Sequence, residues 1–244
     1  MPTRADLAAL RAALDRISTS AKSDLMRILA TVDRTDGAAL RAALTDVWPE
    51  LVGAYGEMSG TVAADVFESW AYDLSLRPKV VHVAGVDAPR ANARMRWGTV
   101  QTDAAGNLIV LLDELVKQPA RSLIQKSAIA SGGGWARVPT GAETCAFCLM
   151  LASRGGVYHT AQTSGRDRKF HGDCDCTPTL VRSPADYPAG YDPDALYDVY
   201  DAGKSAAGYG PDGKALSVTN APKQGSHEDM SAVLSKVRQI TGSH

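Results

Sequence analysis

The sequence predicts a mainly α-helical protein of the α+β class. We expect an elongated N-terminal helical region, a small loop-rich module with short strands, and a C-terminal tail helix. Apolar residues recur at three- and four-residue steps over most of residues 1–131, which is the spacing of amphipathic helices. Residues 135–181 hold all four cysteines and many glycines, and residues 182–244 end in one more amphipathic stretch. These three ranges are the predicted domains.

The first helix is expected to begin at a capping-box-like pair, Thr3 and Asp6. The apolar stripe that follows covers about eight helical turns. Its members are Leu7, Leu10, Leu14, Ile17, Ala21, Leu25, Ile28 and Val32. Such a stripe can pair in a coiled coil, or it can pack on the helices that follow, which is the arrangement we favour.

A second helix is predicted to start at Asp36, whose side chain can cap it, and to reach residue 55. The glycines at the two ends of residues 56–60 are expected to break this helix. A third helix then reaches residue 74 and ends before Pro78.

Residues 79–86 alternate weakly and fit either a short strand or a linker. Helical periodicity returns over residues 91–97 and again over residues 108–128, where Pro119 is expected to kink or restart the helix. Three consecutive glycines, residues 132–134, end this region. They are followed by a tryptophan and not by Lys-Ser/Thr, so they are a hinge and not a phosphate-binding loop.

The tail predicts two further helices. One starts at Asp192-Pro193 and is expected to stop at Gly203. Residues 208–225 form a glycine-rich linker. Ser226 and Asp229 then resemble a capping box at the start of a terminal helix that reaches residue 240. Because an isolated helix of this length is marginal in water, we expect it to dock within this chain or on a partner.

Composition narrows the functional classes. The chain has 244 residues, 45% hydrophobic content and a net charge of -1, so no bulk attraction to nucleic acid follows. The first residues lack the apolar region of a secretory signal, and the longest apolar run, residues 108–112, is far too short to cross a bilayer. We therefore expect a soluble protein made in the cytoplasm, where thiols stay reduced and clustered cysteines indicate metal before disulfide.

The cysteines form two clusters with the spacing of zinc ligands. Cys145 and Cys148 make a CxxC knuckle, and His171, Cys174 and Cys176 make an HxxCxC cluster. Structural zinc takes four such ligands at tetrahedral corners. Five candidates compete for four places, and two sets are favoured. One contains Cys145, Cys148, His171 and Cys176; the other contains the four cysteines, with His171 hydrogen-bonded outside them. His159 is a weaker candidate.

Other uses of these residues fit less well. Disulfides would require export, for which there is no signal. A redox CxxC should start a helix after a strand, whereas this one is expected in a loop rich in Thr and Gly. A zinc deaminase needs His-x-Glu before Pro-Cys-x-x-Cys, and Thr144 stands where that proline would be. Since no acid–base pair or activated nucleophile is visible either, we expect that the protein is not an enzyme.

Four sequence blocks resemble a known family. They are residues 135–139 (Trp-Ala-Arg-Val-Pro), 144–148 (Thr-Cys-Ala-Phe-Cys), 151–158 (Leu-Ala-Ser-Arg-Gly-Gly-Val-Tyr) and 171–176 (His-Gly-Asp-Cys-Asp-Cys). In order and spacing they are similar to the Mu F-like minor head proteins of tailed bacteriophages, in the minor capsid type found in phages of actinobacteria. The Mu form often has Pro-Asn where this chain has Gly172-Asp173.

The resemblance implies a structural minor capsid protein that acts in head morphogenesis. Such a protein belongs to the virion, at the portal vertex or the capsid interior, and is present in the host cytoplasm during assembly. Its implied partners are the portal protein, the major capsid protein or a scaffold protein, with DNA contact inside the head as a further option and no membrane. The stripe from Leu7 to Val32 is then the best candidate for a docking surface, unless it forms the internal core.

A short basic segment of the cysteine module is compatible with a second function. Residues 166–171 (Arg-Asp-Arg-Lys-Phe-His) place basic side chains beside an aromatic residue and a histidine. This pattern favours a zinc-dependent nucleic-acid-binding or nuclease module, although Asp167 and Asp173 dilute its charge. Binding of this kind should weaken steeply as salt rises.

Overall fold

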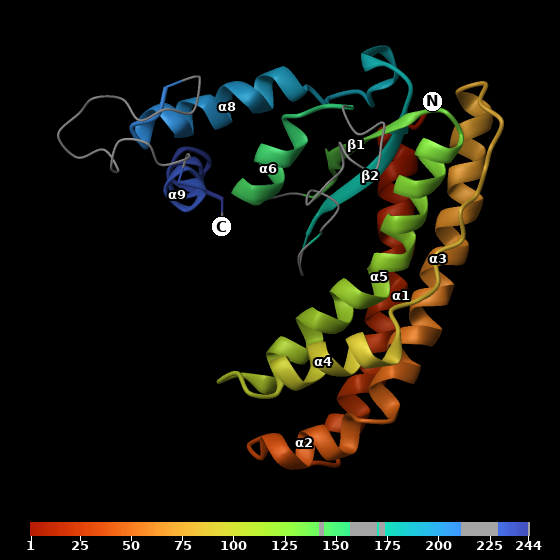
Figure 1. Ribbon diagram of the computed structural model, residues 1–244, viewed down its shortest axis with the longest axis vertical. Helices are drawn as coiled ribbons and strands as arrows, with labels where there is room; N and C mark the ends of the chain where they lie inside the picture. Colours follow the sequence, from red (N-terminus) through yellow and green to blue (C-terminus); the bar gives the residue numbers. More distant parts are fainter. Residues whose placement is uncertain (142–143, 157–169, 171–173, 211–228, 244) are drawn as a thin grey trace.

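The computed structural model describes residues 1–141, 144–156, 170, 174–210 and 229–243, and it confirms the predicted fold class (Figure 1). Helices dominate, and the described strands form one short pair. Among the described residues no helix is long and apolar enough to cross a membrane. The elements are α1 (Arg4–Leu29), α2 (Gly37–Leu44), α3 (Val47–Asp73), α4 (Ala88–Gly98), α5 (Ala104–Ala130), β1 (Gly134–Pro139), α6 (Ala146–Ala152), β2 (Cys176–Val181), η2 (Pro184–Asp186), α8 (Pro193–Ala206) and α9 (Met230–Thr241).

The long helices α1, α3 and α5 lie side by side and form the bundle seen in Figure 1. The predicted capping box at Thr3 and Asp6 is present at the start of α1. The apolar stripe of this helix faces inward, and Leu14 is only 7% exposed. The stripe is therefore internal core, as favoured, and its use as a docking surface was a wrong prediction, because α3 and α5 already cover it.

The predicted helix break at residues 56–60 is wrong, because α3 runs through it without interruption. Both glycines face Pro119 of α5: a Cβ on Gly56 would lie 3.2 Å from the proline ring, and one on Gly60 would lie 3.8 Å away. Between them, the Ser59 hydroxyl donates to the Val116 carbonyl at 2.5 Å, beside the turn that Pro119 deprives of an N–H. The glycines thus allow close helix contact instead of ending the helix.

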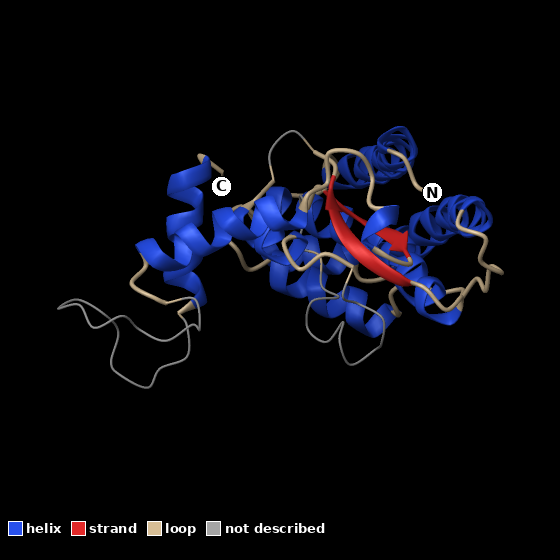
Figure 2. Ribbon diagram, turned by 90° about the horizontal axis from the view of Figure 1, so that it is seen from above, coloured by secondary structure: helices blue, strands red, loops and turns tan. Residues whose placement is uncertain are grey.

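The strands β1 and β2 pair antiparallel, from Gly134 opposite Val181 to Pro139 opposite Cys176. Figure 2 shows the pair among the helices, and both strands contact α5. Trp135 and Leu180 share one apolar cluster with residues of α1, α3 and α5. This packing fixes the position of Cys176, the first residue of β2, relative to the bundle. Residues 79–86 form neither helix nor strand, so the linker alternative is confirmed there.

The tail helices α8 and α9 pack with α6 around a separate apolar cluster that includes Leu149, Tyr209 and Val237. The terminal helix therefore docks within the chain. Asp229 caps it through the N–H groups of the next turn, while Ser226 lies outside the described residues. The predicted stop at Gly203 is wrong, since α8 continues to Ala206. A Cβ on Gly203 would lie 2.4 Å from the Val237 side chain, so the glycine serves the contact with α9.

Candidate metal centre

All four cysteines lie in one buried cluster, together with the ring of Phe170. Cys145 is the N-cap residue of α6 and Cys148 lies in its first turn, whereas Cys174 precedes β2 and Cys176 begins it. None of the four is more than 8% exposed. Two segments that are separate in sequence are thus brought together by the pairing of β1 with β2 and by the short connection from β1 to α6.

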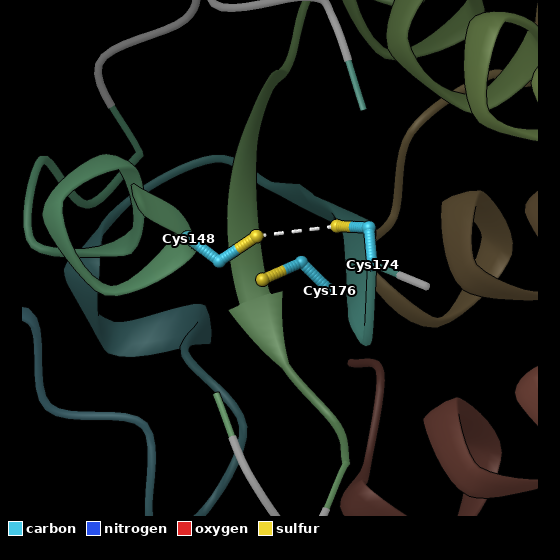
Figure 3. A group of neighbouring side chains, drawn as sticks. All are labelled: Cys148, Cys174 and Cys176. Carbon is cyan, nitrogen blue, oxygen red and sulfur yellow. Dashed lines mark hydrogen bonds between the residues drawn. The ribbon is translucent and has the colours of Figure 1, made fainter. Parts of the chain in front are cut away.

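Three sulfurs lie close enough to share one ion. The Sγ atoms of Cys148, Cys174 and Cys176 lie within 4.8 Å of one another, and those of Cys148 and Cys174 are 3.2 Å apart. Figure 3 shows these three side chains pointing toward a common space. Two thiolates at tetrahedral corners around zinc are about 3.8 Å apart, given Zn–S bonds of about 2.3 Å. All four cysteines are free thiols, so the chemistry of the donor set fits a soft or borderline metal ion.

Cys145 lies in the same buried cluster, at the N-cap of α6, but its sulfur is not one of the three that lie within 4.8 Å of one another. The backbone N–H of Cys148 donates to the Cys145 sulfur at 3.3 Å, so the knuckle is closed by its own helix turn. The expectation that this CxxC lies in a loop was therefore wrong: it starts a helix soon after a strand, and that argument against a redox role does not hold. The site differs from a simple dithiol because the sulfurs of Cys174 and Cys176 also lie close to the Cys148 sulfur.

Asp175 holds the two cysteine segments together. Its backbone carbonyl accepts hydrogen bonds from the Thr140 N–H and the Thr140 hydroxyl. Its carboxylate accepts from the Gly141 N–H at 3.1 Å and from the Thr144 hydroxyl at 3.2 Å. Burial raises the pKa of this carboxyl, and the bond from Thr144 opposes the rise. The chain before Cys145 is thereby anchored on the turn between Cys174 and Cys176.

The pKa values of three of the thiols are shifted, and not all in the same direction. The neighbouring Cys145 and Cys174 side chains raise the pKa of Cys148, and burial raises the pKa of Cys176. Hydrogen bonds from Cys148 and Cys176 lower the pKa of Cys174, and the positive charge of Arg121 adds to this effect. A bound metal ion would displace the protons of the thiols that bind it, because cysteine binds metal as the thiolate.

Two buried arginines flank the cluster, and neither was predicted from the sequence as part of the site. Arg121 of α5 is 4% exposed, and its Nη2 donates to the Cys174 carbonyl at 2.9 Å. Arg137 of β1 is fully buried. Their guanidinium carbons lie 4.6 Å and 3.8 Å from the centroid of the Phe170 ring, a cation–π arrangement. The available signal was a charged residue inside an apolar stretch, as in Trp-Ala-Arg-Val-Pro.

The predicted ligands are placed unequally. Cys148, Cys174 and Cys176 are brought together with Cys145 beside them, whereas His171 lies outside the described residues, as do His159 and residues 166–169. The favoured set that omits Cys174 would leave out a sulfur 3.2 Å from that of Cys148. The choice of the four ligands stays a prediction at this point.

Comparison with known proteins gives consistent matches. The model of the VG15 protein family matches residues 1–203 of the chain. The chain is similar to the gene 15 protein of Mycobacterium phage D29, with 27% identity over 173 residues, which is 59% of this chain and 60% of that protein. It is also similar to the gene 15 protein of Mycobacterium phage L5, with 32% identity over 85 residues, or 32% of this chain and 26% of that protein. No solved structure matches.

Proposed function

The chain belongs to the VG15 protein family and is phage-encoded, and from this premise we propose that it is a structural minor capsid protein that acts in head morphogenesis. The observation that carries the proposal is that the family match spans the helical bundle and the cysteine centre together. Within that span lie the four blocks that resemble Mu F-like minor head proteins. The matched segments cover only part of the two mycobacteriophage relatives. The proposed role therefore rests on the family match together with the four sequence blocks.

The cysteine centre is proposed to hold one structural zinc ion. Cys148, Cys174 and Cys176 would bind it together with Cys145 or His171. When bound, the ion supplies a cross-link between the start of α6 and the start of β2. The residues of the chain already favour this role: the thiols are buried, and Asp175 is occupied by Gly141 and Thr144 instead of being available as a base. Catalytic zinc sites, in contrast, keep an open position for water. We accordingly propose that the protein has no catalytic role.

The proposed location is the virion, at the portal vertex or the capsid interior, with the portal, major capsid or scaffold protein as partner. The direct test is a phage with an amber mutation in this gene, grown with and without a suppressor host. We expect few DNA-filled heads without suppression, and we expect the protein in purified virions after suppression. Normal heads without suppression, from virions that never contain the protein, would contradict the proposal.

The alternative of a nucleic-acid-binding or nuclease module depends on residues 166–171, of which only Phe170 is described. Phe170 is 3% exposed and packs on the cysteine cluster, so its ring is not available to stack on bases. Titration of the zinc-loaded protein with duplex DNA at several salt concentrations separates the two functions. A log–log slope of several units would favour the alternative, and absence of binding favours the structural role.

A further inference from the structure

The exposed side of α4 carries arginines and apolar side chains and no carboxylate. Because the exposed residues follow one another at steps of one to four, they form one stripe along the helix. We call this stripe the α4 face; its members are Pro89, Arg90, Ala93, Arg96 and Trp97, with Val100 just after the helix. The opposite side of α4, with Ala91 and Met95, is buried in the core that it shares with α3 and α5. In Figure 1 the helix lies away from β1, β2 and the tail helices.

Trp97 is left in solvent, although the fold buries its other tryptophans. Trp97 is 53% exposed, and Val100 is 67% exposed. The other three tryptophans are at most 2% exposed; they are Trp48, Trp70 and Trp135. An indole ring gains much free energy when it is removed from water, and tryptophan and arginine dominate the binding energy of many protein interfaces. The exposure of Trp97 beside arginines therefore indicates that another molecule covers this side of the helix.

The positive charge of the α4 face is not used within the described part of the chain. Neither Arg90 nor Arg96 forms an ion pair with a described residue, whereas Arg94, at the border of the face, pairs with Glu114. The carboxylate of Asp87 caps the helix and accepts a hydrogen bond from the backbone N–H of Arg90 at 2.8 Å. Two guanidinium groups are thus available to a partner, and guanidinium groups bind carboxylates through paired hydrogen bonds.

Arg90 lies where the helix itself favours the opposite charge. It is the third residue of α4, in the first turn, where free N–H groups give the helix a partial positive charge. A glutamate at this position would stabilise the helix, whereas an arginine opposes the helix dipole. The fold therefore gains nothing electrostatic from the Arg90 cation, which favours a role in contact with another molecule.

We propose that the α4 face is the docking surface for an acidic protein partner, whose carboxylates pair with Arg90 and Arg96 around an apolar recess for Trp97. A protein is favoured over nucleic acid, because two unpaired arginines would neutralise only about two phosphates and bind weakly. Protein interfaces, in contrast, combine arginine with aromatic anchors and exclude water from both. This inference rests on the proposed function, in which the chain assembles with other head proteins, and it names the surface and the chemistry of that contact.

The surface is tested by supplying plasmid-borne variants to the amber mutant phage and measuring the protein in purified virions. Trp97→Ala and the double variant Arg90→Glu/Arg96→Glu should each be incorporated about 10–30-fold less, as expected for residues that dominate an interface. Tyr72→Ala and Arg77→Glu are the matched controls, because both side chains are exposed at the far end of α3 or just after it. Arg90→Glu alone should fold at least as stably in urea as the unaltered chain, which separates lost docking from lost folding.

The outcomes of this experiment separate the inference from the proposed function. Variants of the α4 face that enter virions as well as the unaltered chain would overturn the inference and leave the proposed function standing. An unaltered chain that never enters virions would end the proposed function and the inference together.

The class of partner is tested by photo-crosslinking in infected cells. A diazirine amino acid is placed at position 97 of the full chain, and at position 72 as control. We expect crosslinks from position 97 alone, to a peptide of a phage head protein that contains Asp or Glu. Changing those carboxylates to lysine should restore incorporation of Arg90→Glu/Arg96→Glu. Crosslinks to DNA, crosslinks to a peptide without carboxylates, no crosslinks, or no restoration would each overturn the inference.

Discussion

Asp113 is a buried charge with several partners at the contact of α5 with α1. It accepts hydrogen bonds from the Ser18 hydroxyl at 2.6 Å and the Lys22 ammonium at 2.8 Å, and it pairs with Lys117 at 3.0 Å. Burial would raise the pKa of this carboxyl, but Lys117, Lys22 and Ser18 outweigh burial and lower it from 3.8 to about 2. Sequence periodicity marked this helix as apolar and gave no indication of a buried carboxylate.

Asp113→Asn should lower the free energy of unfolding at pH 7 by about 2 kcal/mol, at 1.36 kcal/mol per unit of pKa shift. A depressed pKa stabilises the fold above the unfolded-state value of 3.8, and this stabilisation is lost as the pH falls toward 2. The difference between the variant and the unaltered protein should therefore shrink over this range. Urea unfolding at pH 7, 4 and 2 measures it, with Asp65→Asn on the exposed face of α3 as control. A difference that does not change with pH would contradict this account of Asp113.

At the level of elements, sequence periodicity predicted most helices, and the caps at Thr3, Asp36 and Asp229 predicted where three of them begin. Two of the errors about helix ends share one physical cause. Gly56 and Gly203 were interpreted as helix breakers, yet each lies inside a helix where another element approaches closely, Pro119 in one case and Val237 in the other. The local sequence shows that a glycine weakens a helix through its conformational entropy. It does not show which residue from a distant part of the chain will pack against that glycine.

Gly203→Ala should loosen the contact between α8 and α9. The added methyl group would lie 2.4 Å from the Val237 side chain and 3.3 Å from its backbone nitrogen, so α9 has to move away. Amide hydrogen exchange should become faster in α9 and stay unchanged in α1 and α3. Gly53→Ala is the matched control, because nothing lies within 4 Å of its Cβ position inside α3, and it should stabilise the helix by about 0.5–1 kcal/mol. Unaltered exchange in α9 would contradict the close contact.

On the scale of the whole molecule, the cysteine centre joins two packing units. The strands belong to the core of α1, α3 and α5, whereas α6, which is capped by Cys145 and contains Cys148, packs on α8 and α9 as well as on β1. Sequence spacing predicted that the two cysteine clusters meet, but it left five candidate ligands for four places, and one of the two favoured sets omitted Cys174. It could not predict Arg121, Arg137 or Asp175, whose roles depend on how β1 and α5 come together. The division into three domains stays a prediction.

Cys148→Ser should uncouple these two units. Structural zinc in finger peptides contributes on the order of 10–16 kcal/mol, so loss of one central ligand should remove protection from α6 and the start of β2. The helices of the bundle should keep theirs, because their cores do not include the thiols. Hydrogen exchange resolved by segment measures this, with Ser153→Ala at the end of α6 as control. If the bundle helices lost protection together with α6, the two units would not be separable.

Elemental analysis of the protein purified without affinity metals decides whether the four cysteines form a structural metal centre. We expect about one zinc ion per chain after dialysis, as for a closed structural site. The thiols should react with a thiol reagent only once a strong chelator is added. A protein that carries no metal, with four thiols that react at once or are paired in disulfides, would contradict the account.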